Sequence, residues 1–251
     1  MDKRMNMRVE IAEVPFEIRC RFEENLQFLY DYRTEKEPLF SIEPERADLI
    51  RTQEEFDREA VLEGRPKQQF GETFLENNAV HLMLSEKLVS YNVLMLHGSA
   101  LCMDGDAYIF TAPSGTGKST HSRLWREAFG ERIWMINDDK PMLRIKNDGV
   151  MVFGTPWNGK HRLGRNASAP LKAIVWLYRD EQNHIEPMSK VEAFPVLLNQ
   201  AFGSTNLAVM TRVMNLEKEL LNKVGFYKLG CNMETDAAVL AYKGMTADIA
   251  R

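Results

Sequence analysis

The sequence predicts an α/β fold centred on one glycine-rich loop, with a small α+β portion before it. The apolar, β-prone run Ala107 to Thr111 leads into that loop, and apolar residues at helical spacing follow it from Ser119 to Phe129. Short apolar runs of the kind buried in sheets lie on both sides of this unit, and residues 190 to 251 carry helical patterns. This mixture of strands and helices around a glycine-rich turn is typical of α/β folds.

Composition and charge narrow the possible functions. The 251 residues are 44% apolar and 27% charged, and a net charge of −4 gives no electrostatic reason to expect nucleic acid or an anionic membrane as partner. No apolar run approaches the roughly 18 residues of a spanning helix, and the N-terminus lacks a secretory signal, so a cytoplasmic location is predicted. Cys20, Cys102 and Cys231 form no CxxC pair, and neither a disulfide nor a zinc site is predicted.

Residues 1–90 are predicted to form the N-terminal α+β portion. The alternation of apolar residues indicates β-like pieces followed by helices. The pieces are two short strands within residues 7 to 20 divided by Pro15, then Asn25 to Tyr32 and Pro38 to Ile42, a helix from Arg51 to Glu63 and a helix from Gly71 to Tyr91.

Residues 91–251 are predicted to form the nucleotide-binding domain around the glycine-rich loop. The buried run Val93 to Leu96 delivers His97 at its end. An Asp104-Gly-Asp106 turn between two apolar runs predicts a hairpin that leads straight into the loop. His97 is therefore expected on a strand that neighbours the loop.

Beyond the loop's helix, the chain alternates between predicted strands, turns and helices. A buried strand ends at Asn137-Asp138-Asp139, and a hairpin with an Asn147-Asp-Gly149 turn runs into a loop rich in glycine and positive charge, Gly154 to Arg165. The remaining predicted elements are a strand from Leu171 to Tyr178, a helix from Leu207 to Val224, a strand from Phe226 to Cys231 and a helix from Thr235 to Lys243.

The glycine-rich loop, Ala112-Pro-Ser-Gly-Thr-Gly-Lys-Ser-Thr120, matches the phosphate-loop pattern except that Ala112 replaces the first glycine. Small residues let successive backbone N–H groups converge on phosphate oxygens at a helix N-terminus. Lys118 is expected to reach the β- and γ-phosphates, and the Ser119 hydroxyl to bind Mg²⁺. The predicted cofactors are ATP and Mg²⁺; the alternative is a glycine-rich turn that binds nothing. The predicted nucleotide-binding residues are Pro113, Ser114, Gly115, Thr116, Gly117, Lys118, Ser119 and Thr120.

Asp138 and Asp139 follow the strand after the phosphate-loop helix. One carboxylate is expected to bind Mg²⁺, directly or through water, and the other to take the proton from an attacking hydroxyl. The residues themselves do not say which carboxylate has which role. The alternative is a solvated acidic turn.

Three segments together resemble the HPr kinase/phosphorylase family: His97-Gly-Ser-Ala100, Ala112 to Thr120, and Ile136-Asn-Asp-Asp-Lys140. They also resemble the related kinases that modify serine in peptide precursors and, more distantly, the nucleotide-dependent phosphoenolpyruvate carboxykinases. The resemblance covers residues 93 to 180 and implies a P-loop core with a mixed sheet. It further implies that His97 assists the base, that Asp138 is the base, and that Asp139 belongs to the metal site. The family's Glu-Ile-Arg-Gly-Leu-Gly signature is not found; Val152 to Lys160 stands at the comparable place.

The loop from Gly154 to Arg165 is the expected acceptor side. Lys160, as a catalytic cation, and His161, Arg162 and Arg165 offer positive charge for a transferring phosphoryl group, and Trp157 offers a surface for substrate. The alternative is a solvated turn with ordinary surface charge.

The sequence therefore predicts ATP- and Mg²⁺-dependent phosphorylation of a hydroxyl, in Ser or Thr of a peptide or protein or in a small metabolite. The alternatives are a nucleotide-binding regulator or assembly module without catalysis and, third, a carboxykinase. The acceptor, the oligomeric state and the choice between ATP and GTP are not predicted, and a homo-oligomer is compatible with the sequence.

Overall fold

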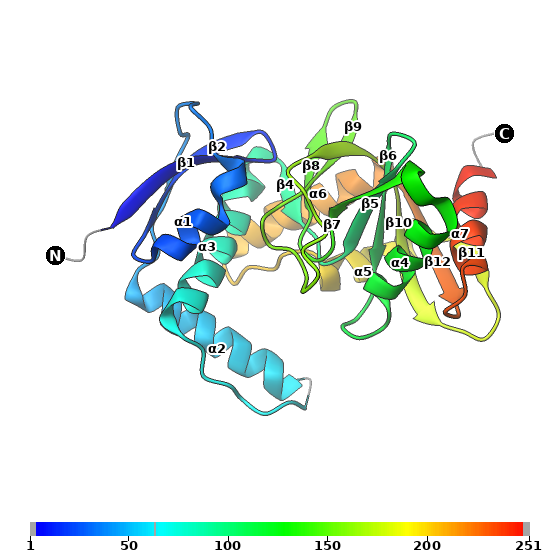
Figure 1. Ribbon diagram of the computed structural model, residues 1–251, viewed down its shortest axis with the longest axis horizontal. Helices are drawn as coiled ribbons and strands as arrows, with labels where there is room; N and C mark the ends of the chain where they lie inside the picture. Colours follow the sequence, from blue (N-terminus) through cyan, green and yellow to red (C-terminus); the bar gives the residue numbers. More distant parts are fainter. Residues whose placement is uncertain (1–3, 63, 248–251) are drawn as a thin grey trace. The chain divides into compact units, whose positions relative to one another are not determined.

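The computed structural model of the chain describes residues 4–62 and 64–247. The chain divides into two compact units, Met1–Leu88 and Val89–Arg251, which can be followed by colour in Figure 1. No helix in the described ranges is long and apolar enough to cross a membrane.

The first unit combines a three-stranded sheet, in the order β1-β2-β3, with helices. Its elements are β1 (Met5–Ile11), β2 (Val14–Cys20), α1 (Glu23–Phe28), the 3-10 turn η1 (Tyr30–Tyr32), β3 (Ser41–Ile42), α2 (Arg46–Leu62) and α3 (Glu72–Leu88). The helices predicted to begin at Arg51 and Gly71 are confirmed as α2 and α3, although their bounds differ from the predicted ones.

The β1-β2 hairpin turns at Ala12 and Glu13, whose φ angles of 53° and 62° lie in the left-handed region. The two predicted strands are confirmed as β1 and β2, but the predicted division at Pro15 is wrong, because Pro15 lies inside β2, opposite Glu10. Buried side chains alternate along β2 on both sides of Pro15, and this alternation keeps the strand intact.

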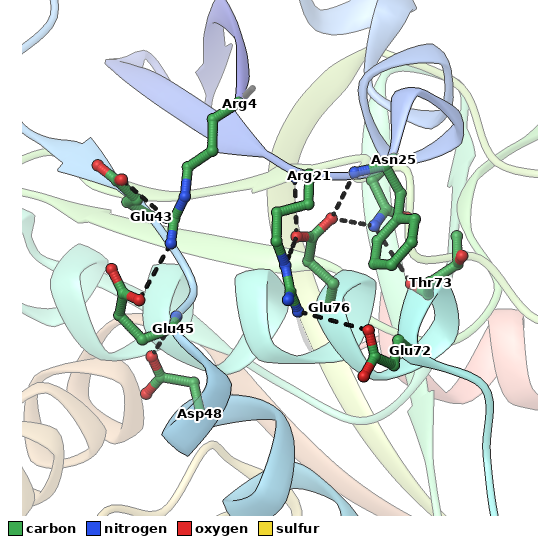
Figure 2. Close-up of polar contacts among 10 residues, drawn as sticks. Arg4, Arg21, Asn25, Glu43, Glu45, Asp48, Glu72, Thr73 and Glu76 are labelled. Atoms are coloured by element: carbon green, nitrogen blue, oxygen red, sulfur yellow. Dashed lines mark hydrogen bonds and ion pairs between the residues drawn. The ribbon is translucent and has the colours of Figure 1, made fainter. Parts of the chain in front are cut away.

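The predicted β-like piece Asn25 to Tyr32 is wrong, because this segment forms α1 and η1. A contact from α3 explains the difference. The fully buried Glu76 carboxylate accepts hydrogen bonds from the amides of Arg21 (2.9 Å) and Phe22 (3.2 Å), at the start of α1, and from Asn25 Nδ2 (2.8 Å), as Figure 2 shows. A carboxylate at this end satisfies amides that have no partner within the helix.

The second unit is an α/β structure with a mixed, curled sheet, which confirms the predicted fold class at this level. Its elements are η2 (Val89–Tyr91), β4 (Val93–Met95), β5 (Ser99–Met103), β6 (Asp106–Thr111), α4 (Lys118–Phe129), η3 (Gly130–Arg132), β7 (Ile133–Asn137), β8 (Met142–Lys146), β9 (Gly149–Phe153), β10 (Ser168–Arg179), β11 (His184–Pro187), α5 (Lys190–Gln200), α6 (Leu207–Lys223), β12 (Gly225–Cys231) and α7 (Asp236–Ala247). Strand β11 and helix α5 had no individual sequence prediction.

The strand order is β4-β8-β9-β10-β6-β5-β7, with β12 beside β10 and β11 beside β12. Strand β10 joins the two parts of the sheet: its first residues pair antiparallel with β9, and the rest runs parallel to both β6 and β12. The β5-β6 and β8-β9 hairpins confirm the two predicted from their turns. Because β6 and β10 are parallel, their carboxyl ends lie at one edge of the sheet.

Helices α4 and α7 pack together over the sheet (Figure 1). The rings of Tyr108 and Phe110 lie 5.3 Å from that of Trp125, and the Tyr242 ring of α7 lies 5.9 Å from it. Tyr108 and Phe110, two residues apart on β6, face the same side of the sheet because successive side chains of a strand alternate between its two faces. The cluster fixes α4, and therefore the turn before it, against the sheet.

The curl of the sheet brings the segment after β9 onto the end of β7. The Arg165 amide donates to Ile136 O (3.1 Å). Side chains have no room at two points here, since an added Cβ would lie 2.7 Å from Ile136 O at Gly154 and 2.9 Å from it at Gly164. The loop between these glycines is thereby held beside the residues that follow β7.

Candidate active site

The glycine-rich loop connects β6 to α4, as the sequence predicts. Gly115 and Gly117 have φ angles of 74° and 124°, which L-residues rarely adopt, although a Cβ at either would meet nothing within 4 Å. Their requirement for glycine is therefore conformational. Ser114 and Ser119 are exposed, and Thr116 and Thr120 are half-buried.

Lys118, the first residue of α4, folds back over the loop. Its ammonium donates to the carbonyls of Ala112 (2.9 Å) and Pro113 (3.4 Å). Burial lowers the Lys118 pKa, the Asp139 carboxylate raises it and the Lys140 ammonium lowers it. Lys118 thus lies within electrostatic reach of the residues that follow β7.

His97 joins the glycine-rich loop to the acidic turn. Its amide donates to Gln200 O (2.7 Å), and its carbonyl accepts from Thr111 Oγ1 (2.8 Å), next to the loop. Its Nε2 lies 3.4 Å from Asp139 Oδ1. Burial, followed by the positive charges of Lys140 and Lys118, lowers the His97 pKa to about 3, so the imidazole is neutral at pH 7.

Position 98, directly after His97, has no room for a side chain. A Cβ at Gly98 would lie 2.9 Å from Ile109 Cγ2 and 3.0 Å from Phe110 O, both on β6. The Gly98 amide donates to Asp139 O (3.0 Å). This hydrogen bond joins the His97 segment to the Asp139 segment, and the close approach of Gly98 to β6 holds the His97 segment beside that strand.

Asp139 is half-buried among charges of both signs. Burial raises the pKa of its carboxyl, Asp138 also raises it, and Lys140 and Lys118 lower it. Asp138 is 7% exposed, and its Oδ1 accepts a hydrogen bond from the Gly159 amide (2.7 Å). The two carboxylates therefore have different neighbours: Asp138 contacts the 154–165 loop, and Asp139 contacts His97.

Asn137 organises this turn from a fully buried position. Its Oδ1 accepts from the amides of Asp139 (2.8 Å) and Lys140 (2.7 Å). Its Nδ2 donates to Thr155 O (3.1 Å) and to Thr155 Oγ1 (3.0 Å). One amide side chain thus fixes the acidic turn and the start of the 154–165 loop relative to each other.

The predicted acceptor loop places Gly159 at Asp138, and Lys160, the next residue, is exposed. His161 and Arg162 are exposed as well. The Arg165 guanidinium lies over the Trp134 ring (5.2 Å to its centroid), and Trp157 is buried. Lys160 through Arg162 are therefore accessible, and Arg165, at the end of the loop, is exposed as well.

Several residues at this site had no predicted role. Lys140 follows the Asp pair and shapes the pKa of both His97 and Lys118. Gln200, at the end of α5, hydrogen-bonds His97 through both backbone and side chain. Arg179, the last residue of β10, donates to Gly115 O (2.8 Å). Lys140 could have been predicted as a site residue because it is a cation next to the Asp pair. Gln200 and Arg179 could not, because they lie far from the site motifs in sequence and fit no motif.

Two cavities border the glycine-rich loop, with volumes of about 680 Å³ and about 440 Å³. Both are lined by Gly115, Thr116 and Arg179. The larger also reaches Thr120 and the end of β12, and the smaller reaches Pro113. Both cavities therefore lie between the glycine-rich loop and the end of β10.

Within residues 4–62 and 64–247, no three His, Cys, Asp or Glu side chains are grouped so as to hold a metal ion. The predicted metal residues Ser119, Asp138 and Asp139 include only two carboxylates. This donor set suits Mg²⁺, which protein sites usually hold through one or two carboxylates together with substrate phosphates and water. The positive-φ glycines and Lys118 likewise suit a phosphate chain.

Comparison with models of protein families and with curated proteins finds no match. Among solved structures, the HPr(Ser) kinase/phosphatase from Coxiella burnetii is similar over 49% of this chain and 88% of its own, with 11% sequence identity and a TM-score of 0.29. A likeness at this level carries no argument about function.

Proposed function

We propose that the protein is an ATP- and Mg²⁺-dependent kinase that transfers the γ-phosphoryl group to a hydroxyl. The observation that carries the proposal is the convergence of Lys118, His97 and Asp139 at the edge of the sheet where the glycine-rich loop lies. A phosphate-binding lysine beside a carboxylate pair is the arrangement that phosphoryl transfer uses.

The donor side is the glycine-rich loop. Its backbone amides and the N-terminus of α4 attract phosphate oxygens, and Lys118 exchanges the carbonyls of Ala112 and Pro113 for the phosphates of ATP. Ser119 and Asp139 would hold Mg²⁺, which supplies positive charge for the phosphates when bound. His97, neutral at pH 7, positions Asp139 without repelling Lys118.

Asp138 is proposed as the base that accepts the proton of the attacking hydroxyl. Its hydrogen bond from the Gly159 amide supports this role, because that amide belongs to the loop proposed to receive the acceptor. Lys160, exposed on the same loop, is proposed to stabilise charge on the transferring group. The acceptor class is a Ser or Thr hydroxyl of a peptide or protein, or a hydroxyl of a small metabolite.

Labelled ATP tests the proposal. The protein is incubated with Mg²⁺, ATP labelled at the γ-phosphate, and sets of serine- and threonine-containing peptides and hydroxylated metabolites. Transfer to an acceptor is expected, with a loss of at least about a hundredfold in Asp138→Asn. Asp148→Asn, an exposed carboxylate in the β8-β9 turn, is the matched control and should be unaffected.

The main alternative, a module that binds ATP without transferring it, predicts a different outcome. It requires tight ATP binding with no labelled product and no effect of Asp138→Asn on binding. The donor site has its own test, because Lys118→Ala should abolish thermal stabilisation by ATP. Unchanged stabilisation in that variant would remove the basis for the kinase and for the module alike.

A further inference from the structure

The strand order gives the glycine-rich loop two unlike sides. The loop follows β6. On one side lie β5, preceded by His97, and β7, followed by Asp138 and Asp139. On the other side lie the carboxyl ends of β10 and β12. A triphosphate on the loop with its reacting end toward His97 and Asp139 therefore directs its other end toward β10 and β12.

The larger cavity, of about 680 Å³, lies on that second side. Its volume falls within the roughly 300–1,000 Å³ of small-molecule sites. Its walls come from the loop, the first turns of α4 and the ends of the two strands. Four apolar residues line it: Leu124 of α4, Leu177 of β10, Cys231 of β12 and Met233 of the segment after β12. Met233 is 77% exposed, which is unusual for a large apolar side chain that borders a cavity.

A buried histidine on the same wall has an unused hydrogen-bond donor. His121, on α4, lines the cavity and is 2% exposed. Trp125 Nε1 donates to its Nε2 (3.0 Å), which leaves the proton of the neutral ring on Nδ1. Among the described residues, Nδ1 has no hydrogen-bond partner. Nδ1 is itself shielded from solvent, so it is an unsatisfied donor within the cavity wall, which costs stability.

We propose that this cavity holds the nucleoside part of the nucleotide, with the base packed against Leu124, Leu177 and Met233. The inference rests on the proposed function, since it assumes a triphosphate on the glycine-rich loop. The smaller cavity is the less suitable one, because no residue of α4 or β12 lines it. Arg179 borders both cavities and hydrogen-bonds Gly115 O, so it stands where the phosphates leave the loop.

Comparison of ATP with inorganic tripolyphosphate distinguishes binding of the nucleoside from binding of the phosphates, because tripolyphosphate has the phosphates but no nucleoside. Binding of Mg·ATP and of Mg·tripolyphosphate is measured by calorimetry on the full chain. Cys231→Trp fills the cavity and should weaken ATP binding at least about tenfold while tripolyphosphate binding changes less than about twofold. Met233→Ala should weaken ATP binding about threefold, and Leu207→Ala, an equally exposed residue outside the cavity, should not.

Alkylation of the wild-type protein gives a second measurement that does not depend on a folded variant. Cys231 is half-buried in the cavity wall, whereas Cys20 and Cys102 are buried. Iodoacetamide labelling of Cys231, followed by mass spectrometry, should be slowed at least about fivefold by saturating Mg·ATP and not by saturating Mg·tripolyphosphate.

Each outcome decides a different point. Equal losses of ATP and tripolyphosphate affinity in Cys231→Trp, or labelling of Cys231 that ATP does not slow, would overturn the nucleoside site and leave the phosphate loop intact. If the wild-type protein binds neither ligand, the proposed function fails and this inference fails with it.

Discussion

Replacing Glu217 by glutamine is expected to stabilise the second unit, and by an amount that depends on pH. Glu217 lies on α6, fully buried, and both carboxylate oxygens lack a hydrogen-bond partner among the described residues. Burial raises the pKa of its carboxyl from 4.5 to about 7. A buried, unpaired carboxylate disfavours folding whenever it must be charged.

The sign and size of the effect follow from the two pKa values. In the unfolded chain the group ionises near 4.5, and in the folded protein only near 7, so stability falls as pH rises between these values and levels off above them. The cost is about 1 kcal/mol at pH 5 and about 3 kcal/mol at pH 8. Glutamine is neutral at every pH, and the variant should therefore exceed the wild type by these amounts.

Urea unfolding followed by tryptophan fluorescence measures the difference. All four tryptophans, Trp125, Trp134, Trp157 and Trp176, belong to the second unit, so the signal reports on the unit that contains Glu217. Glu219→Gln, an exposed change on the same helix, is the control and should leave stability within about 0.5 kcal/mol. A gain in Glu217→Gln that is the same at pH 5 and pH 8, or a loss at pH 8, would refute the reasoning.

Three further substitutions probe other parts of the fold. Asn137→Leu removes the amide that holds the acidic turn and the 154–165 loop. Transfer of labelled phosphate should therefore fall at least about tenfold, and the free energy of unfolding should fall by about 2–3 kcal/mol. Wild-type activity in this variant would contradict the positioning role of Asn137. Gly98→Ala should lower the free energy of unfolding in urea by about 1–3 kcal/mol, because the added Cβ meets β6. The control Gly203→Ala, whose added Cβ has nothing within 4 Å, should lower it by less than about 1 kcal/mol. Equal losses in the two variants would argue against the close approach of Gly98 to β6. Glu76→Ala leaves the amides at the start of α1 without their acceptor, and thermal unfolding followed by circular dichroism should show the first unit destabilised by about 3 kcal/mol; an unchanged transition would count against that contact.

The sequence could predict the elements around the glycine-rich loop because their signals are local. The Asp-Gly and Asn-Asp-Gly turns identify both hairpins, and the phosphate-loop pattern occupies consecutive residues. Segment 25–32 was mispredicted because its conformation depends on Glu76, a residue of another helix. Local propensity does not include such a contact.

The candidate site shows the same division. His97, Lys118 and Asp139 each lie in a short motif, so they could be named, but their proximity results from strand pairing across the sheet. Asn137 stood inside the predicted turn without a role, because its role depends on a buried contact with Thr155. Gln200 comes from α5, beyond the reach of any local pattern.

Gly154 and Gly164 hold both ends of the 154–165 loop against the end of β7, and exposed side chains lie between them. Gly154 and Gly164 cannot carry a side chain without displacing backbone, whereas Lys160, His161 and Arg162 are exposed. Substitutions confined to those three positions can therefore alter the charge and shape of the exposed loop while Asp138, the proposed base, keeps its hydrogen bond from the Gly159 amide. If the proposed kinase activity holds, these three positions are the ones at which acceptor specificity can be redesigned while Gly154 and Gly164 are kept.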